Sequence, residues 1–244
     1  MKILVVGATG ATGHLLVEQL LNRGHHVRAV VRDSAKLPDE LRCNEQLSIV
    51  EASLLDLSDA ELARTVEGCR AVASCLGHNM SWKGIYGQPR RLVTDAIRRL
   101  CKAVKANQRA TLTRFVLMNT AGNSNRDVWE PTSFGQQLVI GLLRLLLPPH
   151  VDNEQAADYL RTEIGQTDET IEWTVVRPDN LTDEDSVTEY SIYPSPIRSA
   201  IFDPGTTSRI NVAHFMADLV TDDDIWRMWK GKMPVIYNKT SAQR

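Results

Sequence analysis

The feature that most constrains the fold of this 244-residue chain is a glycine-rich turn near its start. The turn, Gly7-Ala8-Thr9-Gly10-Ala11-Thr12-Gly13, lies between an apolar strand, Lys2–Val6, and a helical pattern, His14–Asn22. Glycines at its first, fourth and seventh positions allow a tight turn, let the backbone approach a diphosphate and pack the helix close to the strand. The start of the helix adds free N–H groups and a partial positive charge. The turn therefore predicts a dinucleotide site contacted by Gly7, Thr9, Gly10, Ala11, Thr12 and Gly13.

Further strands and helices alternate along the chain. The predicted strands are Val27–Val31, Leu47–Val50, Arg70–Cys75, Arg114–Met118 and Ile171–Val176, and the strongest helical pattern is Pro89–Asn107. Apolar strands separated by helices imply a parallel sheet covered on both faces. We therefore expect an α/β fold, a Rossmann doubly wound parallel sheet with helices on both faces, in one domain over residues 1–244. Substrate-side elements are expected within 78–90, 123–151 and 180–210, the last an irregular C-terminal region because Tyr190–Arg209 contains three prolines.

Composition and charge exclude several classes of function. The net charge of −2 leaves no basic surface for nucleic acid. The apolar stretch Leu138–Leu147 contains Arg144 and is too short for a membrane span, which needs roughly 20 apolar residues. Four cysteines without a metal-binding spacing are typical of free thiols in a reducing cytosol, and the histidines form no ligand cluster. We expect a soluble cytoplasmic protein without metal, nucleic-acid or membrane partners.

The end of the second strand distinguishes the two common dinucleotides. A carboxylate there would bind the adenosine ribose and favour NAD. This strand ends in Arg32-Asp33, with Lys36 one turn later. The Arg32 guanidinium can bind a 2′-phosphate and Lys36 adds a point charge, so NADP is favoured over NAD. Two alternatives stay open: Asp33 could still bind a ribose hydroxyl, and Arg32 could be a solvated strand end.

Several further motifs resemble the atypical branch of the short-chain dehydrogenase/reductase superfamily, over most of the chain. They are the glycine turn, Val30-Val31-Arg32-Asp33, Asp56-Leu57-Ser58-Asp59, Cys75-Leu76-Gly77, Met118-Asn119-Thr120-Ala121-Gly122, Trp173-Thr174-Val175-Val176-Arg177-Pro178 and Ser208-Arg209-Ile210-Asn211-Val212-Ala213. The resemblance implies the fold and a set of contacts to the cofactor.

The implied contacts follow the length of the dinucleotide. Asp56 would bind the adenine amino group with Leu57 beside the ring, unless Ser53 takes that role. Asp56 could instead cap the helix that begins near Ser58. By the same resemblance, Leu76 and Gly77 would pass under the adenosine ribose, and the nicotinamide would be flanked by Pro178, Asn180 and Leu181.

The Tyr-x-x-x-Lys pair of most active members of the superfamily is missing. The residues four positions after the five tyrosines are Arg90, Glu163, Pro194, Ile197 and Ser241. This pattern resembles the group that contains flavin and biliverdin reductases and, close to them, the NmrA-like proteins. In those reductases a flat conjugated acceptor takes hydride directly and solvent can supply the proton, so that no tyrosine is needed. Positioning the acceptor at near-attack distance then supplies much of the rate.

Two residues are predicted to act at the nicotinamide end. Thr120 stands where the family has a serine, and its hydroxyl can donate to a carbonyl or carboxamide oxygen. Asn119 replaces it if the strand is shifted by one residue. Asp152 stands where relatives place an acid, and it could anchor the cofactor or relay a proton. Its alternative role is the N-cap of a helix over Asn153–Thr162.

The loop of residues 78–88 follows the fourth strand and should lie at the ligand-binding edge of the sheet. Its Trp82 and Tyr86 could stack on a planar substrate, or they could seal the core. The sequence thus favours an NADPH-dependent reductase of a flavin, quinone or tetrapyrrole type of acceptor. The alternative is a non-catalytic NADP sensor like the NmrA-like proteins. The oligomeric state, monomer or homodimer, is open because Pro89–Asn107 could pair with a second copy or pack on the sheet.

Overall fold

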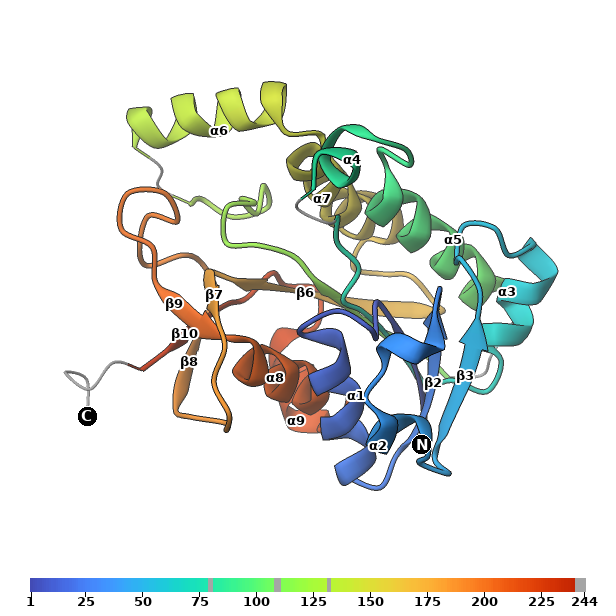
Figure 1. Cartoon of the computed structure of the whole chain (residues 1–244). Helices are drawn as coiled ribbons and strands as arrows, with labels where there is room; N and C mark the ends of the chain where they lie inside the picture. Colours follow the sequence, from blue (N-terminus) through green and yellow to red (C-terminus); the bar gives the residue numbers. More distant parts are fainter. Residues whose placement is uncertain (79–80, 108–110, 131–132, 240–244) are drawn as a thin grey trace.

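An eight-stranded, mostly parallel sheet forms the centre of the molecule (Figure 1). The computed structural model describes residues 1–78, 81–107, 111–130 and 133–239. Strand order is β3-β2-β1-β4-β5-β6-β10-β8. The strands are β1 (Lys2–Val6), β2 (His26–Val31), β3 (Leu47–Glu51), β4 (Ala71–Ser74), β5 (Thr113–Met118), β6 (Ile171–Pro178), β8 (Tyr190–Tyr193) and β10 (Val235–Asn238). Only β8 runs antiparallel to its neighbour, β10. The order reverses between β1 and β4, which confirms the doubly wound topology.

Helices cover both faces of this sheet (Figure 1). The helices are α1 (Gly13–Asn22), α2 (Asp39–Arg42), α3 (Asp59–Val66), α4 (Trp82–Tyr86), α5 (Leu92–Ala106), α6 (Phe134–Leu146), α7 (Pro148–Tyr159), α8 (Arg209–Thr221) and α9 (Asp223–Trp229). A 3₁₀ turn, η1 (Ser34–Lys36), follows β2, and a π-helical turn, η2 (Leu160–Ile164), continues α7.

Alternating side chains of the strands divide the core into two layers. In β1, Ile3 and Val5 pack with α1 and α8, whereas Leu4 and Val6 pack on the opposite face with α3, α5 and α7. All four side chains are buried, as expected for a strand covered on both faces. The apolar positions of α5 face this second layer, which confirms the helical pattern predicted for this segment.

The C-terminal region contains more regular structure than the prolines of Tyr190–Arg209 predict. Besides β8, two short strands, β7 (Asn180–Thr182) and β9 (Thr206–Ser208), pair in parallel beside the main sheet. Strand β10, which the sequence analysis does not predict, joins β6 to β8. The predicted irregular structure is found at residues 194–205, but the prediction is wrong for β8 and β9, because pairing with β10 and β7 supplies the order that local composition does not.

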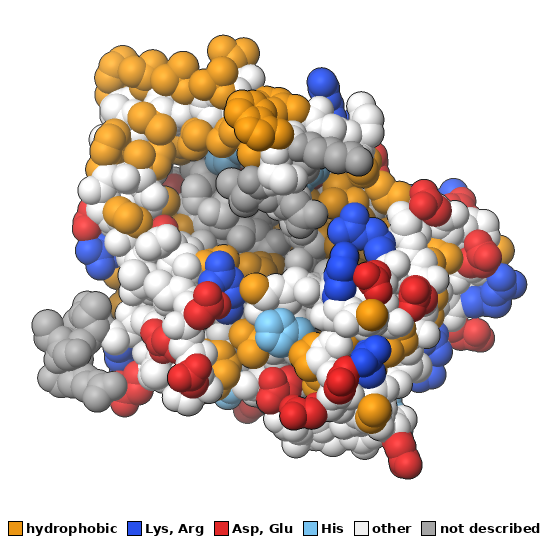
Figure 2. Space-filling view, in the orientation of Figure 1, with side chains coloured by type: hydrophobic (Ala, Val, Ile, Leu, Met, Phe, Trp, Pro, Cys, Tyr) orange, Lys and Arg blue, Asp and Glu red, His pale blue; other side chains and the backbone are white. Residues whose placement is uncertain are grey.

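Helix α6 exposes an apolar surface. Of its residues only Ile140 is buried, whereas Phe134, Leu138 and Leu145 are exposed. In Figure 2 this surface forms the upper rim of a hollow in the face of the molecule. Within the described parts of the chain, no helix combines the length and apolar character needed to cross a bilayer.

Candidate cofactor and acceptor site

The carboxyl ends of six parallel strands, β1 to β6, meet at one edge of the sheet (Figure 1). The residues predicted to contact the cofactor follow these strands: Gly7–Gly13 after β1, Arg32 and Lys36 after β2, Leu76 and Gly77 after β4, Thr120 after β5, and Asn180 and Leu181 after β6, which ends at Pro178. Asp56 and Leu57 follow β3 at the same edge. The topology thus brings residues from six separate segments to the switch point, where ligands of such sheets bind.

The glycine turn is as tightly constrained as its sequence predicts. Gly7 has φ +77°, and a Cβ there would lie 2.6 Å from the carbonyl carbon of Cys75 at the end of β4. At Gly13 a Cβ would lie 2.0 Å from the carbonyl oxygen of Gly7, so the start of α1 packs directly on the turn. The N-cap residue, Thr12, makes no capping hydrogen bond with its side chain, and the first turn contains no acid. The helix start therefore remains suited to an anion.

The two cationic side chains after β2, Arg32 and Lys36, differ in how free they are to bind a phosphate. Lys36 lies 3.6 Å from the carboxylate of Asp33, which also accepts the backbone N–H of Ala35 at 3.1 Å and thereby caps η1. Asp33 is thus already engaged in the turn. The Arg32 side chain is exposed and has no hydrogen-bond or ion-pair partner among the described residues. Arg32 is the more available cation of the two.

Asp56 does not cap the helix that follows it, so that alternative is wrong. The cap of α3 is Ser58, whose hydroxyl accepts from Glu61 N at 3.3 Å while the Glu61 carboxylate accepts from Ser58 N at 2.7 Å. Asp56 itself is exposed, and its N–H donates to the carbonyl of Ser53. Leu57 is half-buried and packs on the α5 layer. The choice between Asp56 and Ser53 as adenine contact stays a prediction.

At the end of β5, Asn119 and Thr120 have different environments. The Asn119 side chain is buried; its amide donates to the carbonyl of Asn153 at 2.9 Å and its oxygen accepts the N–H of Thr120. Asn119 therefore ties β5 to α7. The hydroxyl of Thr120 is half-buried and accepts the N–H of Gly122 at 3.2 Å. No described residue accepts the proton of this hydroxyl, which is therefore available for a ligand.

Asp152 is not an N-cap of its own helix, because α7 begins at Pro148. Instead its buried carboxylate accepts the N–H groups of Val93 at 2.8 Å and Thr94 at 2.9 Å, in the first turn of α5. The N-cap position of α5, Arg91, offers no side-chain cap. Asp152 also bonds Nε2 of His78 at 2.7 Å. Any part of Asp152 in a reaction would therefore act through His78.

The sequence analysis assigns no role to three residues at this edge: His78, His150 and Arg177. His78 directly follows Gly77, and its ring is almost fully buried against Asp152. His150 lies on α7 close to Thr120 and Gly122. For His78 the available signal was its position after a strand, whereas His150 has the carboxylate of Glu154 four residues later on the same helix.

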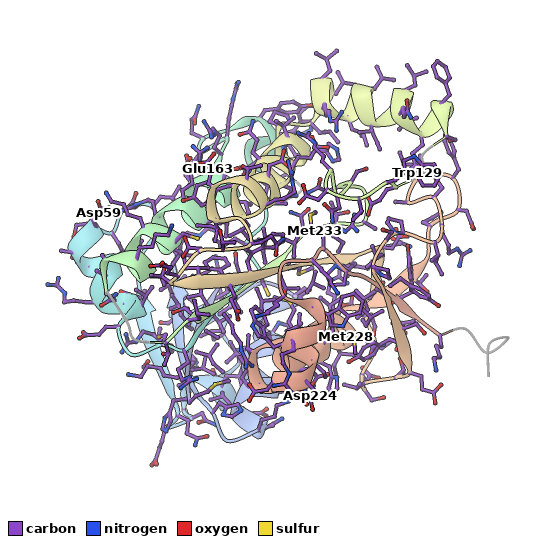
Figure 3. All side chains as sticks on the ribbon, turned by 180° about the vertical axis from the view of Figure 1, so that it is seen from behind. Asp59, Trp129, Glu163, Asp224, Met228 and Met233 are labelled. Carbon is purple, nitrogen blue, oxygen red and sulfur yellow. The ribbon has the colours of Figure 1, made fainter. Side chains whose placement is uncertain are left out.

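Arg177 is fully buried at the end of β6. It pairs with the buried carboxylate of Glu130 at 2.7 Å and donates to the carbonyls of Asn123 and Met233. Met233 lies in the interior beside β6 in Figure 3. A buried charge needs such partners, so Arg177 fixes the loop after β5 against the sheet. The available signal was that Arg177 lies in an otherwise apolar strand motif, where a buried arginine requires a partner.

The two aromatic residues predicted to bind substrate lie on α4. Trp82 and Tyr86 stack on each other with ring centroids 5.5 Å apart, and Tyr86 donates its hydroxyl to the carbonyl of Leu146 on α6. Trp82 is 82% exposed, so it does not seal the core. The pair joins α4 to the apolar surface of α6 above the hollow in Figure 2.

Comparison with known proteins identifies the family. A family model described as NAD(P)H-binding matches residues 7–223. A protein of Synechocystis, named as a proposed dihydroflavonol 4-reductase, is 35% identical over 79 residues, which are 32% of this chain and 22% of that protein. The chain matches only about a fifth of the length of such curated relatives.

Solved structures match along the whole chain. A short-chain dehydrogenase/reductase of Veillonella parvula, solved with NADP, has a TM-score of 0.69 at 18% identity and covers 100% of this chain and 96% of its own. SP1627 of Streptococcus pneumoniae, whose name proposes an NADH-flavin reductase, has a TM-score of 0.65 at 21% identity and covers 98% of this chain and 100% of its own. Because the identities are low, these structures establish the fold alone. The chain belongs to the NAD(P)H-binding family and has the Rossmann fold of the short-chain dehydrogenases/reductases.

Proposed function

We propose that this protein is an NADPH-dependent reductase that transfers hydride to a flat conjugated acceptor of the flavin, quinone or tetrapyrrole type. The observation that carries the proposal is the pairing, at one edge of the sheet, of a nucleotide-binding turn with an aromatic and apolar rim from α4 and α6. Membership of the NAD(P)H-binding family supports a nicotinamide cofactor. An apolar rim with a few polar groups below it suits a planar acceptor.

Two features of the turn support binding of the dinucleotide diphosphate. The uncapped start of α1 offers amides to the diphosphate, and any side chain at Gly7 or Gly13 would collide with backbone. Gly77 has open space where a Cβ would stand, which leaves room for the adenosine ribose. Arg32, which has no partner within the described part of the chain, supports NADPH over NADH, because its guanidinium can bind a 2′-phosphate at two oxygens. Lys36 adds charge at the same phosphate.

The nicotinamide end would be held by residues after β5 and β6. We assign this role to Thr120, Pro178, Asn180 and Leu181. Of these, Thr120 has a hydroxyl proton free to donate to the carboxamide or to an acceptor oxygen. The reduced nicotinamide, when bound, supplies a hydride.

The absence of a tyrosine–lysine pair favours an acceptor that takes hydride directly. Tyr159, the tyrosine of the α7 segment, packs under the guanidinium of Arg98 at 5.4 Å from its ring centroid, in the layer below the sheet edge. Burial raises the pKa of the Tyr159 hydroxyl, which makes it a poorer acid. Carbonyl reductases of this superfamily use a tyrosine as that acid, whereas a conjugated ring system spreads the incoming charge.

A second candidate is an NADP-sensing protein without catalysis, and the exposed apolar surface of α6 favours it. Exposed apolar patches of this kind mark protein–protein interaction sites. In that case bound NADPH would not be consumed.

The test separates the two functions. Purified protein is mixed with NADPH or NADH and a panel of flavins, quinones and biliverdin, and the absorbance of the reduced nicotinamide is followed against blanks without protein. Saturable consumption with one acceptor, faster with NADPH, supports the reductase. If intrinsic fluorescence shows that NADPH binds but no acceptor consumes it, the sensor replaces the reductase.

A further inference from the structure

Reduction of a conjugated acceptor adds a proton as well as a hydride, and the chain lacks the tyrosine that usually gives the proton. The groups that titrate near neutral pH in proteins are mainly histidines. Two histidines, His78 and His150, lie at the carboxyl edge of the sheet.

His150 borders the same spot as Thr120. The position of a Cβ on Gly122 would be 3.7 Å from the Thr120 hydroxyl and 3.9 Å from Cε1 of His150. The imidazole and the hydroxyl therefore lie on the same side of the backbone turn after β5. The His150 side chain is 12% exposed, so its ring is shielded from bulk water without being sealed off.

A carboxylate backs the imidazole. Nε2 of His150 lies 3.4 Å from a carboxylate oxygen of Glu154, one turn later on α7, and this buried nitrogen has no hydrogen-bond partner among the described residues. At this distance Nε2 and Glu154 form an ion pair when the ring is protonated. The arrangement is the one in which a carboxylate orients a histidine and stabilises its imidazolium.

Glu154 is itself held in its ionised form. Arg144, on α6, donates to both carboxylate oxygens at 2.8 to 3.1 Å. Burial acts to raise the pKa of Glu154, but the nearby His150 imidazole and the hydrogen bonds from Arg144 outweigh it and bring the pKa to about 2. Among the residues that the structure describes, the charged groups that face His150 are thus Glu154 on its own helix and, behind it, Arg144 on α6, with Asp158 near Arg144.

His78 is placed differently. Its Nε2 is bound to Asp152 at 2.7 Å, and both carboxylate oxygens of Asp152 also hold the first turn of α5. A change of charge on His78 would disturb that helix start. Neither His150 nor Glu154 caps a helix in the way that Asp152 does. A change of charge on the His150 imidazole would therefore disturb the fold less.

We infer that His150 is the proton donor to the acceptor, oriented by Glu154 as a positioning residue. This inference rests on the proposed reductase. The acceptor takes a hydride from the reduced nicotinamide at one ring atom, and the conjugated system carries the resulting electron pair. His150 then releases the proton on Nδ1 to that electron pair, which leaves a neutral imidazole and the reduced acceptor. Water restores the proton to His150 before the next turnover.

The test compares His150→Asn with His26→Asn, an exposed histidine at the amino end of β2 on the opposite edge of the sheet. Loss of a general acid lowers rates by about 10²- to 10⁴-fold. We expect a loss of kcat in this range for His150→Asn, with the affinity for NADPH, measured by fluorescence titration, unchanged. Wild-type activity should fall at alkaline pH because neutral imidazole has no proton to give, and this fall should vanish in His150→Asn. His26→Asn should keep the wild-type rate and profile.

Two further variants guard against a purely structural effect. Adding free imidazole should partly restore the activity of His150→Ala, because the small base can occupy the space of the missing ring. Glu154→Gln should lower kcat while leaving NADPH binding intact. If His150→Asn reduces the acceptor at the wild-type rate with the wild-type pH profile, the inference is overturned and the reductase stands. If wild-type protein binds NADPH but reduces no acceptor, the reductase fails and this inference fails with it.

Discussion

The carboxylate of Asp152, on α7, accepts the backbone N–H of Thr94, on α5, at 2.9 Å. Through this contact, and a second one to Val93, a residue of one helix caps the start of another. The cap joins the segment after β4 to the segment after β5, and so it sets the spacing of two walls of the candidate site.

Replacing this cap should destabilise the whole fold. In Asp152→Ala, two buried amides and the His78 ring lose their acceptor, and we expect a loss of about 2–4 kcal/mol in the free energy of unfolding. Asp158→Ala, which removes a partly exposed partner of Arg126 and Arg161 on the same helix, should cost less than about 1 kcal/mol. Urea denaturation measures both. Equal losses of unfolding free energy in the two variants would show that the Asp152 cap does not stabilise the fold to this extent.

In the proposed reductase, the preference for NADPH over NADH rests on Arg32. In Arg32→Ala, loss of a charge-assisted contact to the 2′-phosphate should weaken NADPH binding about 10- to 100-fold and leave NADH binding nearly unchanged. Lys36→Ala should have a smaller effect because Lys36 is shared with Asp33. Fluorescence titrations with both cofactors measure these affinities. An unchanged preference for NADPH in Arg32→Ala would remove the basis for this assignment.

Substitution of two glycines distinguishes an effect on the stability of the fold from an effect on cofactor binding. A Cβ on Gly13 would collide with the carbonyl of Gly7, so Gly13→Ala should lower stability and abolish binding together. A Cβ on Gly77 meets no atom within 4 Å, so Gly77→Ala should keep wild-type stability. It should still weaken NADPH binding by about tenfold or more if the ribose passes over this residue, which corresponds to about 1.4 kcal/mol. Thermal unfolding and NADPH titration of the same samples show whether a variant loses binding while it keeps its stability.

Acid should weaken the fold at the start of β6. Asp168 accepts the N–H groups of Thr170 and Ile171 and pairs with Lys105. Burial opposes ionisation of this carboxyl, but the hydrogen bonds from Lys105 and Thr170 hold its pKa at about 2. Because the folded-state pKa lies below the unfolded one, this stabilisation is complete above about pH 4 and is lost as the pH falls toward 2. Asp168→Asn should therefore be less stable than wild type at neutral pH, and the difference in urea midpoint should shrink over that interval. A difference that stays constant from pH 7 to pH 2 would contradict this origin.

Much of the fold could be predicted because its signals are local. The glycine turn, the alternation of apolar strands with helices and the amphipathic pattern of α5 each depend on a few neighbouring residues, and together they predict a doubly wound sheet. The short strands of the C-terminal region could not be predicted in this way. Strand β8 is ordered by pairing with β10, more than forty residues later in the chain, and no local pattern reports that contact.

The candidate site shows the same division. Residues that follow strands, such as Gly7, Arg32 and Thr120, could be placed from the topology. The role of Asp152 could not, because an Asp early in a helical pattern indicates a cap of its own helix, whereas its real partners are on α5. Likewise the pairing of Arg177 with Glu130 spans 47 residues. Such contacts exist only once distant segments are packed together.

The central claim, hydride transfer from NADPH to a conjugated acceptor, is tested most directly by a single turnover without oxygen. Protein saturated with one equivalent of NADPH is mixed rapidly with the acceptor from the panel that steady-state assays favour, and the absorbances of both are followed together. We predict that NADPH and the oxidised acceptor disappear in one phase, in equal amounts, and only with protein present. Bound NADPH whose absorbance stays constant with every acceptor of the panel would contradict the reductase and leave the NADP sensor.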